Sequence, residues 1–227
     1  MGIIEKQTIR GSFFSYLGVA FGFITVGLLW PRFLEADAIG VINFLVAIAA
    51  ILAHLASLGI NSVAIRLFPY FRDEKKGHNG FLALALFFCL IGSTLVLLYY
   101  LLFKERIIAN NIEKSYLVAR YACFIVPFTV ATLLYNLFDS LHKVSYNAVI
   151  GVFVKDFLFR VLNLLLILAY AFFSFRFQLF LNAYFVIFSL PALILIIALA
   201  RGGQFDLRIR TGFISKDLRR SIVDVGF

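Results

Sequence analysis

Long apolar runs alternate with short polar segments along this chain of 227 residues. The apolar runs lie at residues 12–34, 39–60, 81–103, 116–138, 149–173 and 179–200. A membrane-spanning helix needs roughly 20 mostly apolar residues, whereas the strands of membrane barrels are shorter and alternate in polarity. The pattern therefore predicts an all-α polytopic membrane protein, in which residues 1–200 form a bundle of six transmembrane helices.

The composition also separates this chain from soluble proteins. Hydrophobic residues make up 63% of it, charged residues make up 15%, and the mean hydropathy is +0.98. Soluble domains are about 45–50% apolar and about 25% charged, so a soluble core of this size could not bury so much apolar surface. The formal net charge of +9 comes from cations between the apolar runs, which favours membrane topology over nucleic-acid binding.

Basic residues in the segment 57–80, which we predict to be a loop, indicate how the chain crosses the bilayer. Arg66 and Arg72 are joined there by two lysines, against two acidic residues. Lys and Arg beside membrane spans stay on the cytoplasmic side, because their translocation is costly. Most of the 21 basic residues fall on the same side as this segment, so both termini are predicted to be cytoplasmic.

The chain changes character after its last apolar run. Residues 201–220 are basic and polar, and they contain two adjacent glycines. We expect a cytoplasmic connector here. Residues 221–227 look like the start of another apolar helix, so we expect the chain to be one half of a longer protein.

Within four of the runs, small or polar residues recur three or four positions apart, which places them on one helix face. In the first run this stripe is Gly11, Ser15, Gly18, Gly22 and Thr25. In the second it is Asn43, Ala47, Ala50, His54, Ser57 and Asn61. In the fourth it is Thr129, Thr132, Asn136, Asp139 and Lys143, and in the fifth it is Asp156, Arg160 and Asn163.

These stripes have two explanations. Small and weakly polar residues pack membrane helices together, and the first stripe favours that explanation. Polar groups at membrane depth otherwise face a water-filled cavity, and the amides, histidine and carboxylate of the other stripes keep that alternative open. Several polar faces in one bundle are most simply explained by a shared cavity.

Charges inside the fifth run need separate treatment, because one Lys or Arg at a helix centre costs about 2.5–3.5 kcal/mol. Lys155, Asp156 and Arg160 are therefore expected near the inner boundary of the membrane. Lys155 and Arg160 either extend to the headgroups, with Asp156 paired to Arg160, or form a cationic mouth to the cavity.

Signatures of enzymes are missing from the sequence. It contains no glycine-rich phosphate loop after a strand, no nucleophile elbow and no His and acid cluster with metal spacing. Cys89 and Cys123 each lie inside an apolar run and are expected to pack inertly. We therefore predict no catalytic residue, no metal site and no cofactor.

Three stretches resemble a known family: GIIEKQTIRGSFFSYLG at the start, RFLEADAIGVIN at the first turn, and SLGINSVAIRLFPYFRDEKKGHNG at the second. They are similar to the N-terminal lobe of bacterial polysaccharide-biosynthesis flippases of the O-antigen, Wzx-like type. These belong to the multidrug/oligosaccharidyl-lipid/polysaccharide superfamily.

The resemblance implies two six-helix lobes around a central cavity in the bacterial inner membrane. It also implies transport of undecaprenyl-pyrophosphate-linked oligosaccharides by alternating access, with cationic cavity residues meeting the substrate. The expected partners are the lipid bilayer, that substrate and a second lobe, in the same or a separate chain. Nucleic acid is not an expected partner.

The polar stripes supply the candidate substrate-binding residues. They are Asn43, His54, Ser57, Asn61, Arg66, Thr132, Asn136, Asp139, Asp156, Arg160 and Asn163. Arg66 and Arg160 are expected to attract the pyrophosphate near the cytoplasmic side. The alternatives are a cation-coupled exporter of small molecules on the same scaffold and a membrane subunit without transport activity of its own.

Overall fold

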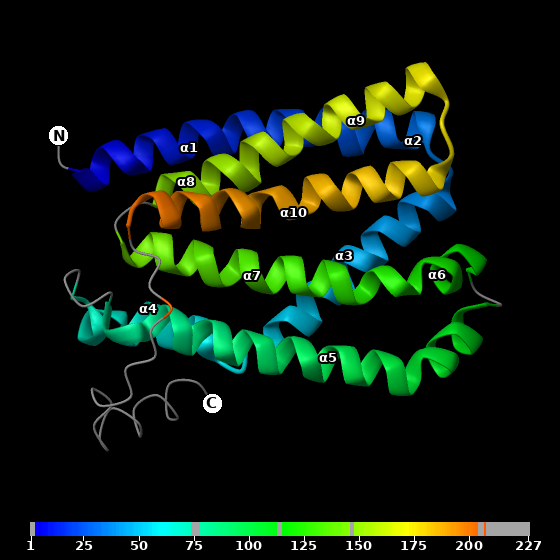
Figure 1. The fold of residues 1–227 in the computed structure, drawn as a ribbon. Helices are drawn as coiled ribbons and strands as arrows, with labels where there is room; N and C mark the ends of the chain where they lie inside the picture. Colours follow the sequence, from blue (N-terminus) through cyan, green and yellow to red (C-terminus); the bar gives the residue numbers. More distant parts are fainter. Residues whose placement is uncertain (1–2, 74–77, 113–114, 146–147, 204–206, 208–227) are drawn as a thin grey trace.

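The computed structural model of this protein describes residues 3–73, 78–112, 115–145, 148–203 and 207, and in these ranges the regular secondary structure is entirely helical (Figure 1). Six helical stretches follow one another along the described chain. They are α1 (Ile3–Gly22) with the π-helix η1 (Phe23–Leu29) and α2 (Trp30–Phe33); α3 (Ala36–Ala56) with α4 (Ile60–Phe71); α5 (Phe81–Ile112); α6 (Tyr116–Tyr121) with the 3-10 helix η3 (Ala122–Phe124) and α7 (Ile125–Val144); α8 (Ala148–Val152) with the π-helix η4 (Phe153–Leu158) and α9 (Phe159–Phe173); and α10 (Phe177–Arg201).

Helices of membrane-spanning length confirm the predicted fold class. Among the described residues, five helices are long and apolar enough to cross a membrane: Gln7–Phe33, Ala36–Ala56, His78–Ala109, Tyr116–Val144 and Phe177–Arg201. The remaining predicted span, 149–173, is helical from α8 to α9 and runs along the same axis (Figure 1), but it is not among these five. The chain is therefore an all-α polytopic membrane protein.

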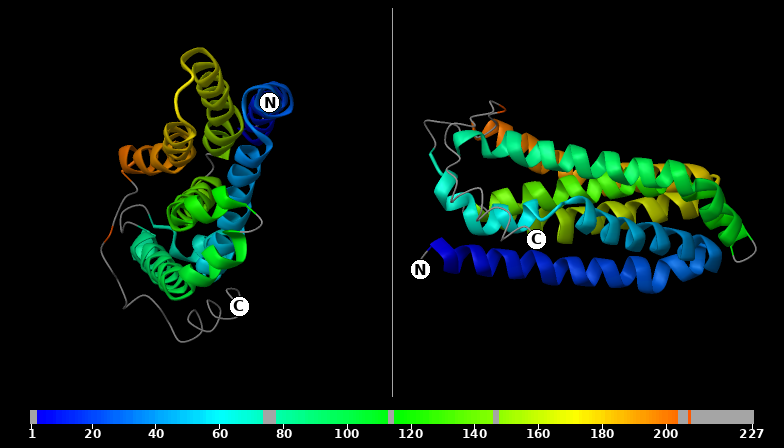
Figure 2. Two further views of the ribbon diagram at one scale, coloured as in Figure 1. Left: turned by 90° about the vertical axis from the view of Figure 1, so that its right-hand side faces the viewer. Right: turned by 90° about the horizontal axis from the view of Figure 1, so that it is seen from below.

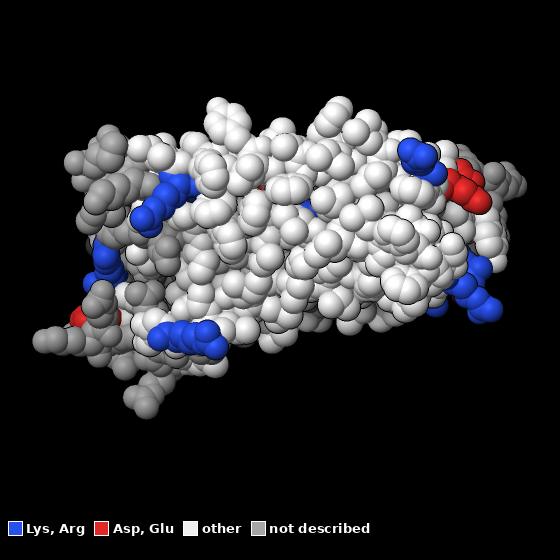
Figure 3. Space-filling model, turned by 90° about the horizontal axis from the view of Figure 1, so that it is seen from above, with Lys and Arg blue, Asp and Glu red and all other residues white. Residues whose placement is uncertain are grey.

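Charged side chains gather at the two ends of the bundle. Figure 3 shows one long face on which Lys, Arg, Asp and Glu lie near both ends, while the broad middle is almost free of them. Hydrocarbon cannot solvate charge, so an uncharged belt between two charged rims is expected of a protein that sits in a bilayer.

Helix α7 occupies the centre of the bundle, as the end-on view in Figure 2 shows. It packs against α3, α4, α5, α8 and α10. Two clusters of buried apolar side chains surround it, one toward each end of the bundle. Phe138 belongs to the first cluster and Phe128 to the second, and both rings are almost completely buried.

The predicted loop at 57–80 is largely wrong, because residues 60–71 form helix α4. The break from α3 lies at Leu58 and Gly59, whose φ angles of 45° and 74° are left-handed. Glycine adopts that conformation without steric cost, so it allows the turn. The buried face of α4 follows helical spacing and consists of Ile60, Val63, Ala64, Leu67, Phe68 and Phe71.

The connections between stretches alternate between the two ends of the bundle. The start of α1, the end of α4, the start of α5, the end of α7, the start of α8 and the end of α10 lie at one end, and the 34–35 and 174–176 turns lie at the other (Figure 1). This alternation agrees with the predicted threading, although the cytoplasmic orientation of the N-terminus stays a prediction. Apart from 201–203 and 207, the predicted connector and the further helix at 221–227 lie outside the described residues.

Candidate functional site

Charged residues lie on α7 and on the neighbouring stretch that runs from α8 to α9. We define the charged cluster as Asp139 and Lys143 of α7, Lys155 and Asp156 of η4, and Arg160 of α9. Two of its members, Asp139 and Lys143, pair with each other, whereas Lys155 and Asp156 contact residues outside the cluster.

The small-residue stripe of α1 packs directly on the helix that carries these charges. The Ser15 Oγ donates a hydrogen bond of 2.9 Å to Asp156 Oδ2. A Cβ added at Gly18 would overlap the Asp156 carbonyl oxygen, and one at Gly22 would lie 3.0 Å from Arg160 Nη1. The absence of side chains at these two glycines therefore allows the close contact of α1 with η4 and α9.

Arg160 lies halfway along the stretch that runs from α8 to α9. Both α1 and α9 run away from the N-terminal end of the bundle (Figure 1), so Gly22 lies deeper than Gly18. The guanidinium is closer to Gly22, with its Cζ 3.5 Å from a Cβ placed there. The Arg160 guanidinium therefore lies against α1 at the level of Gly22, about halfway along its own helical stretch.

The expected ion pair between Asp156 and Arg160 does not form. The described residues show an ion pair between Lys143 Nζ and Asp139 Oδ2, at 2.6 Å, and none that involves Arg160. Asp156 instead takes the Ser15 hydroxyl as its partner. Arg160 is therefore a half-buried cation without a carboxylate at ion-pair distance among the described residues.

Lys155 is held by an aromatic ring of α7. Its Nζ lies 4.3 Å from the centroid of the Tyr135 ring, a cation–π contact. One turn further along α7, the side chain of Asp139 is 12% exposed and packs against Gly151 of α8, where a Cβ would overlap Oδ1. Gly151 therefore lets the acid approach the helix that carries Lys155.

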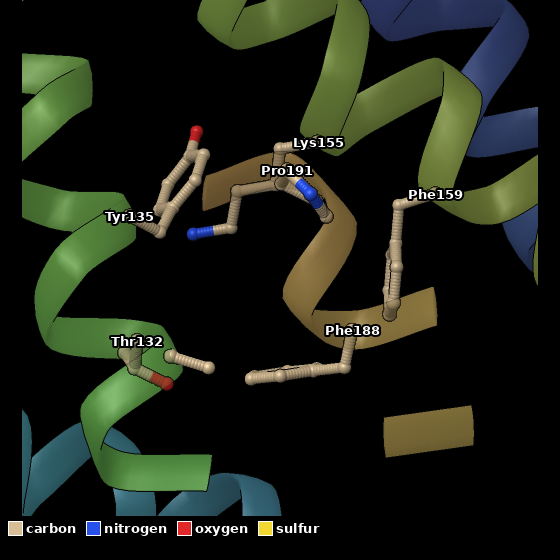
Figure 4. Close-up of a pocket in the computed structure, with 7 residues that line it drawn as sticks. Thr132, Tyr135, Lys155, Phe159, Phe188 and Pro191 are labelled. Atoms are coloured by element: carbon tan, nitrogen blue, oxygen red, sulfur yellow. The ribbon is translucent and has the colours of Figure 1, made fainter. Parts of the chain in front are cut away.

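A small cavity of about 50 Å³ lies beside Lys155. Figure 4 shows Lys155 and Tyr135 on one side, Phe159 and Phe188 on the other, and Thr132 at its edge. A bound water needs about 10–15 Å³ of such volume, so the cavity has room for a few waters but not for a sugar. In this conformation the cavity can hydrate the ammonium group, and it does not form a substrate chamber.

The polar stripe of α3 does not join the charged cluster. Asn43 and His54 are exposed on the outer surface of the bundle, and no residue of α3 lines the cavity beside Lys155. Ser57 is buried at the end of α3, where its hydroxyl donates to the His54 carbonyl oxygen at 2.7 Å. Arg66 is exposed on α4. A single chamber lined by all the predicted residues is therefore not present in this chain.

Three predicted amides are half-buried or buried. Asn136 is half-buried on α7. Asn61 is also half-buried, and its Oδ1 lacks a hydrogen-bond partner. Asn163 is buried one turn beyond Arg160; its Nδ2 donates to the Phe159 carbonyl oxygen at 3.0 Å, while its Oδ1 has no partner. Buried oxygens without partners are costly, so both mark places where water or a ligand can bind.

Three residues at this site were not among the candidate substrate-binding residues, although two of them were noted from the sequence. Ser15 contacts the charged cluster, Lys155 belongs to it, and Tyr135 contacts Lys155 and lines the cavity. Tyr135 precedes Asp139 by four positions, a spacing that could have identified it. Among the described residues, no group of His, Cys, Asp and Glu could hold a metal ion.

Comparison with protein-family models, with curated proteins and with solved structures finds no significant match to this chain.

Proposed function

We propose that this chain is one lobe of a transporter that moves a lipid-linked anionic oligosaccharide across the bacterial cytoplasmic membrane. It is a flippase of the type that the sequence resembles, it works by alternating access, and it catalyses no reaction. The observation that carries the proposal is Arg160, a half-buried cation about halfway along its helical stretch, without a carboxylate at ion-pair distance in the described residues.

The cost of Arg160 supports a functional role. An Arg at the centre of a membrane helix costs about 2.5–3.5 kcal/mol on the insertion scale, and such residues mark substrate pathways. A guanidinium presents a planar fork of donors that matches phosphate oxygens. A pyrophosphate on the substrate offsets the cost of this charge whenever it passes, which a sugar alone cannot do.

The exposed stripe of α3 supports a second lobe. Asn43 and His54 lie on the surface of a helix that is apolar enough to span the membrane. Hydrocarbon offers them no hydrogen bond, so a facing lobe or a water-filled path between lobes would satisfy them. The transport path in this proposal lies between the two lobes, with Arg160 near its wall.

A flipping assay tests this function. The full chain, purified with any membrane subunit that accompanies it, is reconstituted into liposomes with fluorescent undecaprenyl-pyrophosphate-linked N-acetylglucosamine. We expect translocation to fall at least about tenfold in Arg160→Gln, as loss of a charge-assisted hydrogen bond implies. Arg160→Lys should fall less, and Arg201→Gln, exposed at the end of α10, should match the parent chain. Unchanged flipping by a normally folded Arg160→Gln variant would refute the proposal.

A cation-coupled exporter of small molecules is the second candidate, and the buried carboxylate of Asp139 favours it. In that case Asp139→Asn should abolish export while Arg160→Gln retains it. If the chain is a membrane subunit without transport activity, even the parent chain would show neither flipping nor export.

A further inference from the structure

A much larger cavity opens at the end of the bundle opposite the N-terminus. Its volume is about 400 Å³, and its wall is formed by the α2–α3 turn, by α6 and by the α9–α10 turn. Figure 1 shows these segments together at that end, away from the N-terminal ends of α1 and α8. Ligand pockets measure about 300–1,000 Å³, so this cavity can hold a polar headgroup.

Positive charge converges on this cavity from two separate helices. Arg120 of α6 and Arg176 at the start of α10 line it, and the acidic residue that lines it is Glu35. Two long helices, α3 and α10, also begin at its wall, and neither has a side-chain hydrogen bond at its N-cap. The first turn of a helix carries partial positive charge, which adds to that of the two guanidinium groups.

Aromatic rings fix one side of the cavity. Tyr121 and Phe177 stand edge to face with centroids 5.6 Å apart, and they join α6 to α10. The Arg120 Cζ lies 5.7 Å from the centroid of the Tyr121 ring, so a cation–π contact orients this guanidinium. An oriented arginine loses less side-chain freedom when it binds a ligand than a freely moving one does.

We propose that this cavity binds the phosphate of an anionic headgroup or phosphate ester. Two arginines offer donors in the planar arrangement that suits phosphate, and basic pockets between membrane helices are suited to anionic lipid headgroups. The cavity lies at the ends of the spanning helices, where headgroups meet water. The inference does not rest on the transport proposal, because a lobe without flipping activity would keep the same cavity.

The test uses the full chain in nanodiscs of phosphatidylcholine with increasing phosphatidylglycerol, and native mass spectrometry counts the bound anionic lipid. In a second arm, inorganic phosphate is titrated into nanodiscs of phosphatidylcholine alone. We expect saturable binding in at least one arm. Binding of lipid without inorganic phosphate identifies the membrane as the source, whereas binding of both identifies phosphate itself as the recognised group.

Substitutions separate this site from general attraction to the membrane surface. Arg120→Gln and Arg176→Gln should each weaken binding about tenfold, the loss expected for a charge-assisted hydrogen bond. Glu35→Gln should strengthen it, a change that misfolding cannot imitate. Arg32→Gln is the matched control, because Arg32 is exposed at the same end but does not line the cavity. Equal losses in Arg32→Gln and Arg120→Gln, or no saturable binding in either arm, would overturn the proposal.

Discussion

Gly18 and Gly22 decide how closely α1 approaches the charges of η4 and α9. Their lack of a side chain lets α1 lie on the Asp156 backbone and on the Arg160 side chain. The same contact brings the Ser15 hydroxyl to Asp156. At the scale of single residues, the small-residue stripe therefore has two effects, since it packs helices and also gives Asp156 a hydroxyl partner.

The effect of a methyl group at Gly18 tests this contact. In Gly18→Ala the new Cβ would overlap a backbone carbonyl, so α1 must shift, and overpacking of this kind costs about 1–3 kcal/mol. We expect a lower thermal unfolding temperature in detergent. Gly11→Ala is the control, because no atom lies within 4 Å of a Cβ there and alanine favours helix. Equal unfolding temperatures for the two variants would contradict the close packing of α1.

At the scale of elements, the long helices were predicted from the sequence and α4 was missed. Runs such as 81–103 can be recognised by their length and apolarity, because a helix that spans the bilayer needs both. Helix α4 is amphipathic, and Asn61, Ser62 and Arg66 on its exposed face lower its average hydropathy enough to suggest a loop. Its signal was the spacing of Val63, Leu67 and their apolar neighbours.

Cysteine scanning across residues 60–71 distinguishes a helix from a loop. We expect a water-soluble thiol reagent to label cysteines at exposed positions 62, 66 and 69 rapidly, and those at buried positions 63, 67 and 71 slowly. The cause is burial of one helix face against α5 and α7. Labelling at a uniform rate along the segment would contradict helix α4 and support the loop predicted from the sequence.

The candidate site shows the same limit of sequence reasoning. The stripe pattern identified Asp156 and Arg160 as residues of one helix face, and the structure brings Asp139 to the same helix through Gly151. The partners of these groups could not be predicted, because the contact of Ser15 with Asp156 joins segments 141 positions apart. Such contacts depend on how helices align along each other, which the periodicity of each helix does not encode.

At the scale of the whole molecule, the bundle has an uncharged belt, two charged ends and an arginine near its middle. The belt and the ends are what a bilayer requires, whereas the arginine is costly there. The two cavities described above differ in size and position. The one beside Lys155 is small and interior, and the one beside Arg176 is large and lies at the end of the bundle. The account therefore depends on whether water reaches the level of Arg160.

The most direct measurement is thiol accessibility at that level, in a chain whose Cys89 and Cys123 are replaced by Ala and Ser. A charged, membrane-impermeant methanethiosulfonate reagent reacts with thiols in water and not with those in hydrocarbon. We predict that it modifies the cysteine of Arg160→Cys and spares that of Leu165→Cys, which lies on the same helix with an exposed apolar side chain. If neither cysteine reacts, or if both react equally, Arg160 does not face a water-filled path and the transport account is contradicted.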